Sequence, residues 1–295
     1  MSMQVADIPE IAADPGSKEI YKGLELIRHV PCGTEILNVD LTQPLANGQF
    51  DAVMDVWHRS RVVVFRNQKL GPADQLRFGR RVGELSIIHT EEFAGEDPAI
   101  MYISNVKEDG TFVHALPVGE MMFHIDQCYK PLPAKATILY AMKLPKTGGN
   151  TLFGDMIAAY DALDGETKAR IEGLNALNVY DYDAGATHTA SDISPDAPHY
   201  AHPIVRTHPV TGQKGLFINR LMTRSIIGLS EAEGRVLLEE LFDHQENSDF
   251  IYEHRWQLLD LLMWDNRCTV HARRDFNLEE TRLLRRVTVL GETPA

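Results

Sequence analysis

The feature that most constrains this chain is a pair of potential metal ligands, His124 and Asp126, separated by a single residue. A third potential ligand, His271, lies far downstream. Because side chains at positions i and i+2 of a β-strand point to the same face, His124 and Asp126 are predicted to share one face of a strand. If another strand brings His271 beside them, two imidazoles and one carboxylate can bind a single ion. This ligand set leaves coordination positions open and is typical of non-haem Fe(II) oxygenases.

Downstream of His271, an arginine-rich segment predicts a strand with a cationic inner face. Strand parity places Arg282 and Arg286 on one face and Arg285 on the other. Guanidinium groups are costly to bury without anions, and their planar fork binds carboxylates bidentately. The sequence therefore predicts a carboxylate-binding site close to the metal ligands. The alternative is a solvated basic strand edge.

Length, charge and cysteine usage restrict the class of protein. The chain has 295 residues, of which 44% are hydrophobic, and this is sufficient for one domain spanning residues 1–295. Residues 1–20 contain several helix and strand breakers and are predicted to be a loosely ordered arm. A net charge of -13 argues against nucleic acid and anionic membrane surfaces as partners. Three widely spaced cysteines, the lack of a signal sequence and the lack of a membrane-length apolar run predict a cytoplasmic protein with a small-molecule partner.

Apolar periodicity and turn residues predict a mainly β protein with helical decoration. The regularly spaced apolar residues and capping residues predict helices over residues 51–60, 72–82, 156–174 and 230–244. Residues 180–203 are rich in turn formers and are predicted to form a loop. Strands are predicted at residues 62–65, 101–105, 134–142, 215–219, 258–263 and 283–290, with another beginning at residue 24.

Several motifs in combination resemble the Fe(II)- and 2-oxoglutarate-dependent dioxygenases of the taurine dioxygenase and dichlorophenoxyacetate dioxygenase type (the TauD/TfdA family). The resemblance extends from about residue 24 to residue 290. The family's His-x-Asp motif matches His124 and Asp126, and its distal histidine matches His271. Its Gly-Gly-x-Thr-x-Phe motif matches the segment from Gly148 to Phe153, and its two downstream arginines match Arg282 and Arg286.

The resemblance implies a double-stranded β-helix, also called a jelly-roll or cupin-like core, with the metal in its mouth. The implied cofactor is Fe(II), with 2-oxoglutarate and O2 as co-substrates. By the same resemblance, Thr151 and Arg282 hold the distal carboxylate of 2-oxoglutarate and Arg286 meets an anionic group of the prime substrate. The implied reaction is hydroxylation of a small organic acid, such as an aryloxyalkanoate or alkyl sulfonate, with C–O or C–S cleavage for some substrates. A homo-oligomer, either a dimer or a tetramer, is also a family expectation.

Three positions depart from the family pattern and leave the prime substrate open. Glu120 stands where the family has an asparagine, and it either repels an anionic substrate or faces solvent. Gln127 is larger than the residues usual beside the metal pair, and it either orients the substrate or points outward. His89 lies near, but not clearly at, a substrate-binding histidine of the taurine enzymes.

Two alternatives from other classes fit part of the pattern. Because catalytic zinc commonly takes three protein ligands and a water, the same jelly roll could be a zinc-dependent enzyme. A non-catalytic barrel that binds 2-oxoglutarate or another organic acid is the second alternative. Thr151 and Arg282 have no evident role in the zinc interpretation, and intact metal ligands have none in the binding-barrel interpretation.

Overall fold

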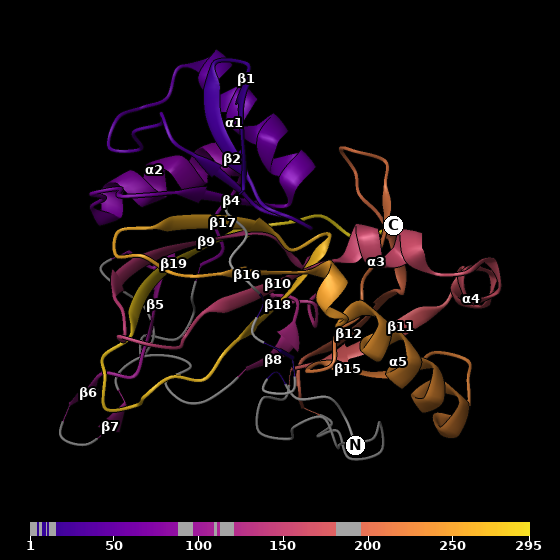
Figure 1. Cartoon of the computed structure of the whole chain (residues 1–295). Helices are drawn as coiled ribbons and strands as arrows, with labels where there is room; N and C mark the ends of the chain where they lie inside the picture. Colours follow the sequence, from indigo (N-terminus) through magenta and orange to yellow (C-terminus); the bar gives the residue numbers. More distant parts are fainter. Residues whose placement is uncertain are drawn as a thin grey trace.

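Two β-sheets packed face to face form the centre of the molecule (Figure 1). The computed structural model describes residues 16–87, 97–108, 111–112, 121–180 and 196–295, together with residues 5, 8, 9 and 11. The larger sheet has eight strands, in the order β1 (Ser17–Tyr21), β2 (Leu24–Arg28), β3 (Thr34–Ile36), β4 (Val62–Phe65), β17 (Leu261–Asp265), β9 (Ala134–Lys143), β19 (Leu283–Leu290) and β5 (Ile100–Ser104). The smaller sheet has four strands, in the order β16 (Ile251–His254), β10 (Thr151–Asp155), β18 (Thr269–Arg273) and β8 (Met121–His124). The predicted mainly β, jelly-roll class is confirmed.

The inner faces of the two sheets pack through a shared apolar cluster. Leu139, Leu262 and Leu284 come from the larger sheet, whereas Phe153 and Tyr252 come from the smaller one. Successive strand residues point to opposite faces. The residues on either side of Leu139 in β9 therefore point to the outer face of the sheet, where they join a different apolar cluster. Strands β4, β17, β9, β19 and β5 of the larger sheet therefore contribute to two cores, one on each face.

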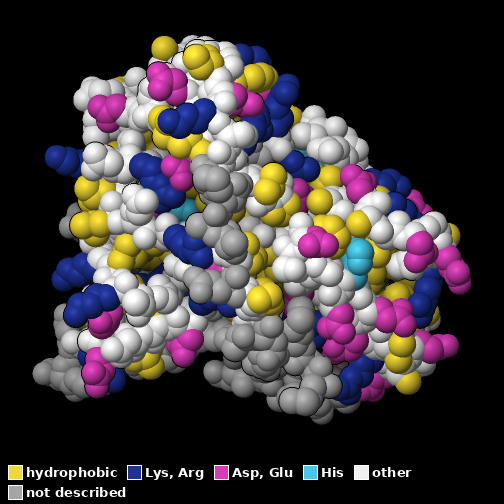
Figure 2. Space-filling model, viewed as in Figure 1, with side chains coloured by type: hydrophobic (Ala, Val, Ile, Leu, Met, Phe, Trp, Pro, Cys, Tyr) yellow, Lys and Arg dark blue, Asp and Glu magenta, His cyan; other side chains and the backbone are white. Residues whose placement is uncertain are grey.

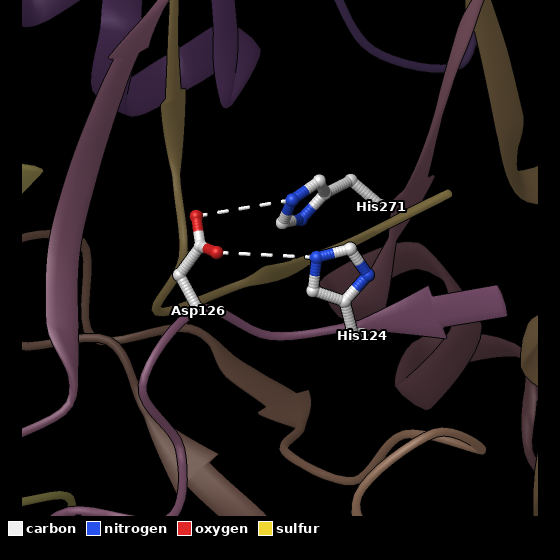
Figure 3. A group of neighbouring side chains, drawn as sticks. All are labelled: His124, Asp126 and His271. Carbon is white, nitrogen blue, oxygen red and sulfur yellow. Dashed lines mark ion pairs between the residues drawn. The ribbon is translucent and has the colours of Figure 1, made fainter. Parts of the chain in front are cut away.

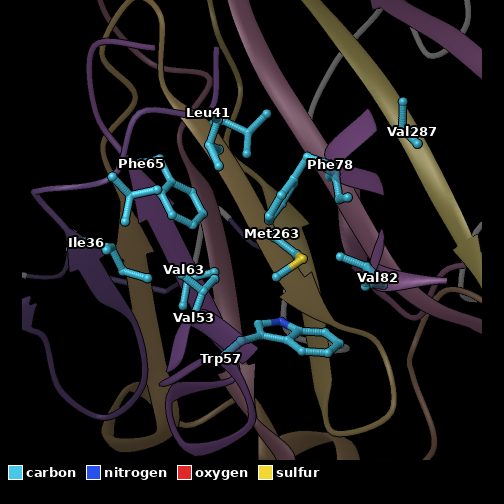
Figure 4. Packing of buried hydrophobic residues seen from close by; sticks show 14 of the residues in the cluster. Ile36, Leu41, Val53, Trp57, Val63, Phe65, Phe78, Val82, Met263 and Val287 are labelled. Atoms are coloured by element: carbon cyan, nitrogen blue, oxygen red, sulfur yellow. The ribbon is translucent and has the colours of Figure 1, made fainter. Parts of the chain in front are cut away.

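Two helices cover the outer face of the larger sheet. These are α1 (Asn47–Ser60) and α2 (Pro72–Val82). The second matches its predicted range, whereas the first begins before the predicted start at residue 51. Trp57 of α1 and Phe78 of α2 pack onto Val63 and Met263 of the sheet, as Figure 4 shows. Asp74 caps the start of α2 by accepting a hydrogen bond from the backbone N–H of Gly71 at 2.9 Å. This layer secures the back of the sheet and leaves its inner face to form the pocket.

Most of the remaining elements lie on the outer side of the smaller sheet, whereas one small two-stranded sheet lies at the opposite end of the molecule, next to β5 (Figure 1). They include the helices α3 (Met156–Ala162), α4 (Gly165–Ile171) and α5 (Glu231–Gln245), and the short 3-10 helix η4 (Ser248–Phe250). Three small sheets complete the fold: β12 (His199–Pro203), β11 (Asn175–Val179) and β15 (Thr223–Ile226); β13 (Val205–Thr207) and β14 (Lys214–Leu216); and β6 (Lys107–Glu108) and β7 (Thr111–Phe112). Ser230 caps α5 through the predicted capping box with Glu233.

The structure corrects four of the predicted elements. The single helix predicted over residues 156–174 is two helices, because Leu163 is extended and the Asp164 side chain caps a new helix by accepting from the Thr167 N–H. The predicted loop 180–203 ends in strand β12, and residues 181–195 lie outside the described residues. The strand predicted at 258–263 begins only at Leu261, and the one predicted at 215–219 ends at Leu216.

The surface is charged and mixed. Figure 2 shows acidic and basic side chains interspersed over the visible face, with small groups of hydrophobic side chains between them. Among the described residues, no helix is long and apolar enough to cross a membrane. In the predicted N-terminal arm, Ser17–Tyr21 form β1. Val5 and Ile8 are buried in the apolar cluster that the smaller sheet forms with α3 and α5.

Candidate active site

His124, Asp126 and His271 meet in the interior of the jelly roll (Figure 3). His124 is the last residue of β8 and pairs directly with His271 of β18. Their imidazole centroids are 4.0 Å apart. The prediction that one strand carries both His124 and Asp126 is wrong, because β8 ends at His124 and Asp126 lies in the turn that follows. That turn still directs the carboxylate toward both imidazoles.

The spacing of the three side chains suits one metal ion. The Asp126 carboxylate oxygens lie 3.9 Å from His124 Nε2 and 3.8 Å from His271 Nε2. A first-row divalent ion binds nitrogen and carboxylate ligands at about 2.1 Å, so two of its ligand atoms can be up to about 4.2 Å apart. Both separations fall within that limit. The donor set of two nitrogens and one oxygen therefore fits the non-haem Fe(II) site expected from the sequence.

Hydrogen bonding and burial leave the ligands in the protonation states that metals require. His124 Nδ1 lies 3.0 Å from the Met122 carbonyl oxygen. Because a carbonyl can only accept, Nδ1 carries the proton and Nε2 presents its lone pair to the site. Burial lowers the pKa of both His124 and His271, so both imidazoles are neutral at pH 7. Burial opposes ionisation of Asp126, but the positive charge of Arg286 and the hydrogen bond from the Thr137 hydroxyl hold its pKa well below its usual value.

A chain of buried hydrogen bonds orients the Asp126 carboxylate. The Thr137 hydroxyl donates to Asp126 Oδ2 at 2.5 Å, and it accepts from Asn266 Nδ2 at 3.0 Å. The other end of the Asn266 amide accepts from Trp264 Nε1 at 3.0 Å. Each member therefore has a defined donor or acceptor role, which restricts rotation of the carboxylate. The end of β17 and the turn that begins at Asn266 thus support the Asp126 carboxylate as well as the strand that carries His271.

This chain predicts that Thr137→Val weakens metal binding. Valine keeps the shape of threonine but removes the hydroxyl, so the Asp126 carboxylate loses its orienting donor. Loss of such a contact to a metal ligand typically costs about 10- to 100-fold in affinity. Titration of the metal-free protein with Mn(II) or Fe(II) measures this. Thr34→Val is the matched control, since Thr34 is equally buried and its hydroxyl bonds Ser60 far from the site. Equal metal affinities in the two variants would contradict the orienting role.

A pocket opens beside the triad. Its polar lining includes His124, His271, Thr151 and three arginines, and its apolar lining consists of Ile103, Met121, Leu139, Trp264, Ala272 and Leu284. Arg282, Leu284 and Arg286 all line the pocket, which confirms the parity predicted for β19. Arg285 points away and donates to Gln75 Oε1 at 2.7 Å.

The side chains of Arg282 and Thr151 can both donate hydrogen bonds to an anion in the pocket. Arg282 is 3% exposed, and its Nε lacks a hydrogen-bond partner among the described residues. Burial, and then the proximity of Arg273, lower the pKa of Arg282 to about 9. The Thr151 hydroxyl accepts from Trp256 Nε1 at 3.0 Å, so its own proton remains available to donate. A carboxylate in the pocket would satisfy both donors.

The Gly148–Gly149 turn permits the close approach of Arg282. Both glycines have positive φ, at 77° and 68°. A Cβ on Gly149 would lie 3.0 Å from Arg282 Nε, and one on Gly148 would lie 2.4 Å from the Asp275 carbonyl oxygen. The Gly149 carbonyl also accepts from Arg282 Nη2 at 3.2 Å. Glycine is therefore required at both positions, because only it combines the positive φ with the absence of a side chain.

Arg286 contacts the triad itself. Its Nη2 lies 2.8 Å from Asp126 Oδ1, and its Nε donates to the Thr288 hydroxyl at 3.1 Å. It therefore lies between the metal ligands and the rest of the pocket, where it can also meet a bound anion.

The three remaining predicted substrate residues are placed as follows. Gln127 adopts a left-handed conformation with φ of 57°, and its side-chain amide donates to Ser86 Oγ at 3.3 Å. Among the described residues, Gln127 is not part of the pocket lining. His89 and Glu120 lie outside the described residues.

Two residues of the site were missed by sequence reasoning. Arg273 lines the pocket two positions after His271, so strand parity applied to β18 would have found it. Trp256, which hydrogen-bonds Thr151, lies in the loop after β16, and its position follows no local pattern.

A second buried group of potential ligands, His208, Asp265 and Cys268, is structural. His208 Nδ1 accepts from two backbone N–H groups, so its protonated Nε2 donates to Asp265 at 3.0 Å. Arg267 binds both Asp265 carboxylate oxygens, at 2.8 and 2.6 Å. These bonds occupy the lone pairs that a metal would need. The group instead braces the turn that leads into β18.

Comparisons with known proteins agree with this geometry. The family model "Taurine catabolism dioxygenase TauD, TfdA family" matches residues 25–288. The chain is 34% identical over 269 residues to the alpha-ketoglutarate-dependent 2,4-dichlorophenoxyacetate dioxygenase of Cupriavidus pinatubonensis, covering 86% of this chain and 93% of the relative. It is 34% identical over 253 residues to the (S)-phenoxypropionate/alpha-ketoglutarate-dioxygenase of Sphingobium herbicidovorans, covering 80% and 84%. The crystal structure of AAD-2 in complex with Mn(II) and N-oxalylglycine is similar with a TM-score of 0.82 and 31% identity, covering 92% of this chain and 99% of that one.

Proposed function

Because the chain belongs to the TauD/TfdA dioxygenase family, we propose that its pocket hydroxylates a small organic acid at an iron held by His124, Asp126 and His271. The protein is an oxidoreductase that uses Fe(II), 2-oxoglutarate and O2. When bound, the iron supplies the coupling of substrate hydroxylation to decarboxylation of 2-oxoglutarate, so that 2-oxoglutarate, O2 and R–H become succinate, CO2 and R–OH. The proposal rests on one observation. The pocket beside the triad is also lined by Arg282 and Thr151, two groups that can donate hydrogen bonds to a carboxylate.

The protein's own residues bind, orient and exclude water. We assign the distal carboxylate of 2-oxoglutarate to Arg282, whose buried fork offers bidentate contact, and to the Thr151 hydroxyl. Such fixed donors in a dry pocket place a 2-oxo acid with its keto end toward the triad, and they need little reorganisation on binding. The zinc and binding-barrel alternatives are not favoured, because family membership accounts for both the metal ligands and the carboxylate donors.

The lining of the pocket favours an aryloxyalkanoate as the prime substrate. Apolar side chains from both sheets, including Ile103, Met121 and Leu139, suit an aromatic body, whereas Arg286 suits a single carboxylate at one end. Two relatives carry phenoxyacetate and phenoxypropionate substrates in their names, which supports this class over a fully polar sulfonate. Hydroxylation at the carbon that bears the ether oxygen would lead to C–O cleavage and release of a phenol.

Anaerobic titration of the metal-free protein with Fe(II) and 2-oxoglutarate tests the enzyme assignment. We expect the weak visible charge-transfer band of an iron-bound 2-oxo acid to appear, and we expect substrate-dependent release of succinate once O2 is admitted. A screen of aryloxyalkanoates and alkyl sulfonates by succinate release then tests the substrate class. If Fe(II) binds but no band develops, the assignment of 2-oxoglutarate to this pocket is wrong.

Replacing Arg286 by glutamine is expected to raise the KM for an anionic substrate by about tenfold or more, because a charge-assisted contact is lost. Metal affinity should not fall, since Arg286 shares the Asp126 carboxylate with the metal rather than binding the metal. Steady-state kinetics and Mn(II) titration separate the two effects. An unchanged KM would place the substrate anion elsewhere.

We further propose a cytoplasmic location and a homo-oligomeric state. All three cysteines are free and buried, which suits a reducing compartment. Size-exclusion chromatography with light scattering measures the oligomeric state directly.

A further inference from the structure

Arg273 is a second buried cation in the part of the pocket assigned to the co-substrate. It lies on β18 two residues after His271, so both side chains share the inner face of the sheet. It is 7% exposed and stands directly opposite Thr151 on the neighbouring strand β10. Side chains in such cross-strand positions have Cβ atoms about 5 Å apart. Arg273 and the Thr151 hydroxyl are therefore neighbours.

Arg273 is also a neighbour of Arg282. Both guanidinium groups lie over the same aromatic ring, that of Phe276, at 5.5 Å for Arg273 and 5.8 Å for Arg282. The charge of Arg273 contributes to the lowered pKa of Arg282. Two buried cations this close repel each other, and a bound anion relieves that cost. Asp275 also acts on the charge of Arg273, and a carboxylate in the pocket would act on both cations.

We propose that Arg273 and Arg282, with Thr151, form a two-arginine subsite for the distal carboxylate of the co-substrate, which restricts the enzyme to 2-oxo dicarboxylates. The inference rests on the proposed function of the pocket. A carboxylate offers about four acceptor positions, so one distal group can accept from both guanidiniums and from the hydroxyl. A 2-oxo acid that ends in a methyl group offers no acceptor to either guanidinium or to the hydroxyl. Discrimination between these two types of acid should therefore be large.

The carboxylate of the prime substrate is the other possible occupant. The position of Arg273 favours the co-substrate, because its cross-strand partner is Thr151 and it shares the Phe276 ring with Arg282. Arg286, which contacts Asp126, occupies the side of the pocket nearer the metal ligands.

The test compares 2-oxoglutarate with 2-oxopentanoate, which has the same carbon chain without the distal carboxylate. Anaerobic binding to the Fe(II)-loaded protein is measured for wild type, Arg273→Gln and the exposed control Arg80→Gln. We expect Arg273→Gln to raise the Kd of 2-oxoglutarate by about 10- to 100-fold. The Kd of 2-oxopentanoate should change little, and Arg80→Gln should match wild type for both acids.

Three results would overturn the inference or its premise. An unchanged Kd for 2-oxoglutarate in Arg273→Gln overturns it, as does an effect confined to the KM of the prime substrate. Failure of the wild type to bind 2-oxoglutarate refutes the proposed function itself. If Arg273→Gln is unstable in thermal unfolding, Arg273→Lys takes its place. Lysine keeps the charge but loses the fork, so we expect a smaller but measurable rise in the Kd of 2-oxoglutarate, and wild-type affinity would again overturn the inference.

Discussion

Asp126→Ala is expected to abolish turnover by removing the metal. The carboxylate is the only anionic member of the triad, and both imidazoles lie within 4 Å of it. Two neutral imidazoles alone bind a divalent ion much more weakly, and loss of even an indirect contact typically costs about 10- to 100-fold. We therefore expect metal affinity to fall by more than about 100-fold. Calorimetric titration with Mn(II), which avoids oxidation, measures this directly.

Asp51→Ala provides the control for this substitution, because Asp51 is exposed on α1 and far from the site. The two variants should unfold at similar temperatures in the absence of metal, apart from the loss of the Arg286 ion pair. Added metal should raise the midpoint of Asp51→Ala but leave that of Asp126→Ala unchanged, because only a protein that binds the ion is stabilised by it. Retention of full metal affinity in Asp126→Ala would show that the ion binds elsewhere.

Arg282→Gln is expected to cause the largest loss of co-substrate binding. Removing one partner of a buried, hydrogen-bonded charge pair typically costs about 2–5 kcal/mol, which corresponds to roughly a 30- to 4,000-fold rise in the Kd of 2-oxoglutarate. Metal affinity should remain close to that of wild type, because Arg282 makes no contact with the triad among the described interactions. Anaerobic titration with 2-oxoglutarate after loading with Fe(II) measures the two affinities separately.

Arg285→Lys is the matched control for Arg282→Gln. Arg285 lies on β19, three residues after Arg282, but it points away from the pocket, toward Gln75 and the Leu70 carbonyl. Its replacement should lower the free energy of unfolding and leave the affinity for 2-oxoglutarate unchanged. If both variants lost that affinity equally, the effect would reflect general damage to β19 rather than a carboxylate site.

Much of the candidate site could be predicted because its key features are local or periodic. Strand parity separated Arg282 and Arg286 from Arg285, and the pocket lining agrees. The Gly148–Gly149 turn was recognisable because few residues other than glycine tolerate its conformation. The prediction that His124 and Asp126 lie on one strand was wrong, because Asp126 lies in the turn after β8.

The incorrect predictions of secondary structure arose where the apolar periodicity does not determine the local conformation. The apolar spacing over residues 156–174 is continuous, yet Asp164 starts a second helix because its side chain satisfies a free backbone N–H there. Likewise, β12 forms from a turn-rich segment because the neighbouring strand β11 supplies its hydrogen bonds. Such pairing depends on a partner distant in sequence.

The types of metal ligand, the face on which each arginine lies and the family of the chain could all be predicted from the sequence alone. The three-dimensional structure was needed to show which side chains meet: Thr137 bonds Asp126, Trp256 bonds Thr151, and Arg273 stands opposite Thr151 and lies over the ring of Phe276. The physical reason is that parity specifies the face of a residue but not its neighbour. Neighbours are set by the register between strands, and register follows from the packing of the whole core.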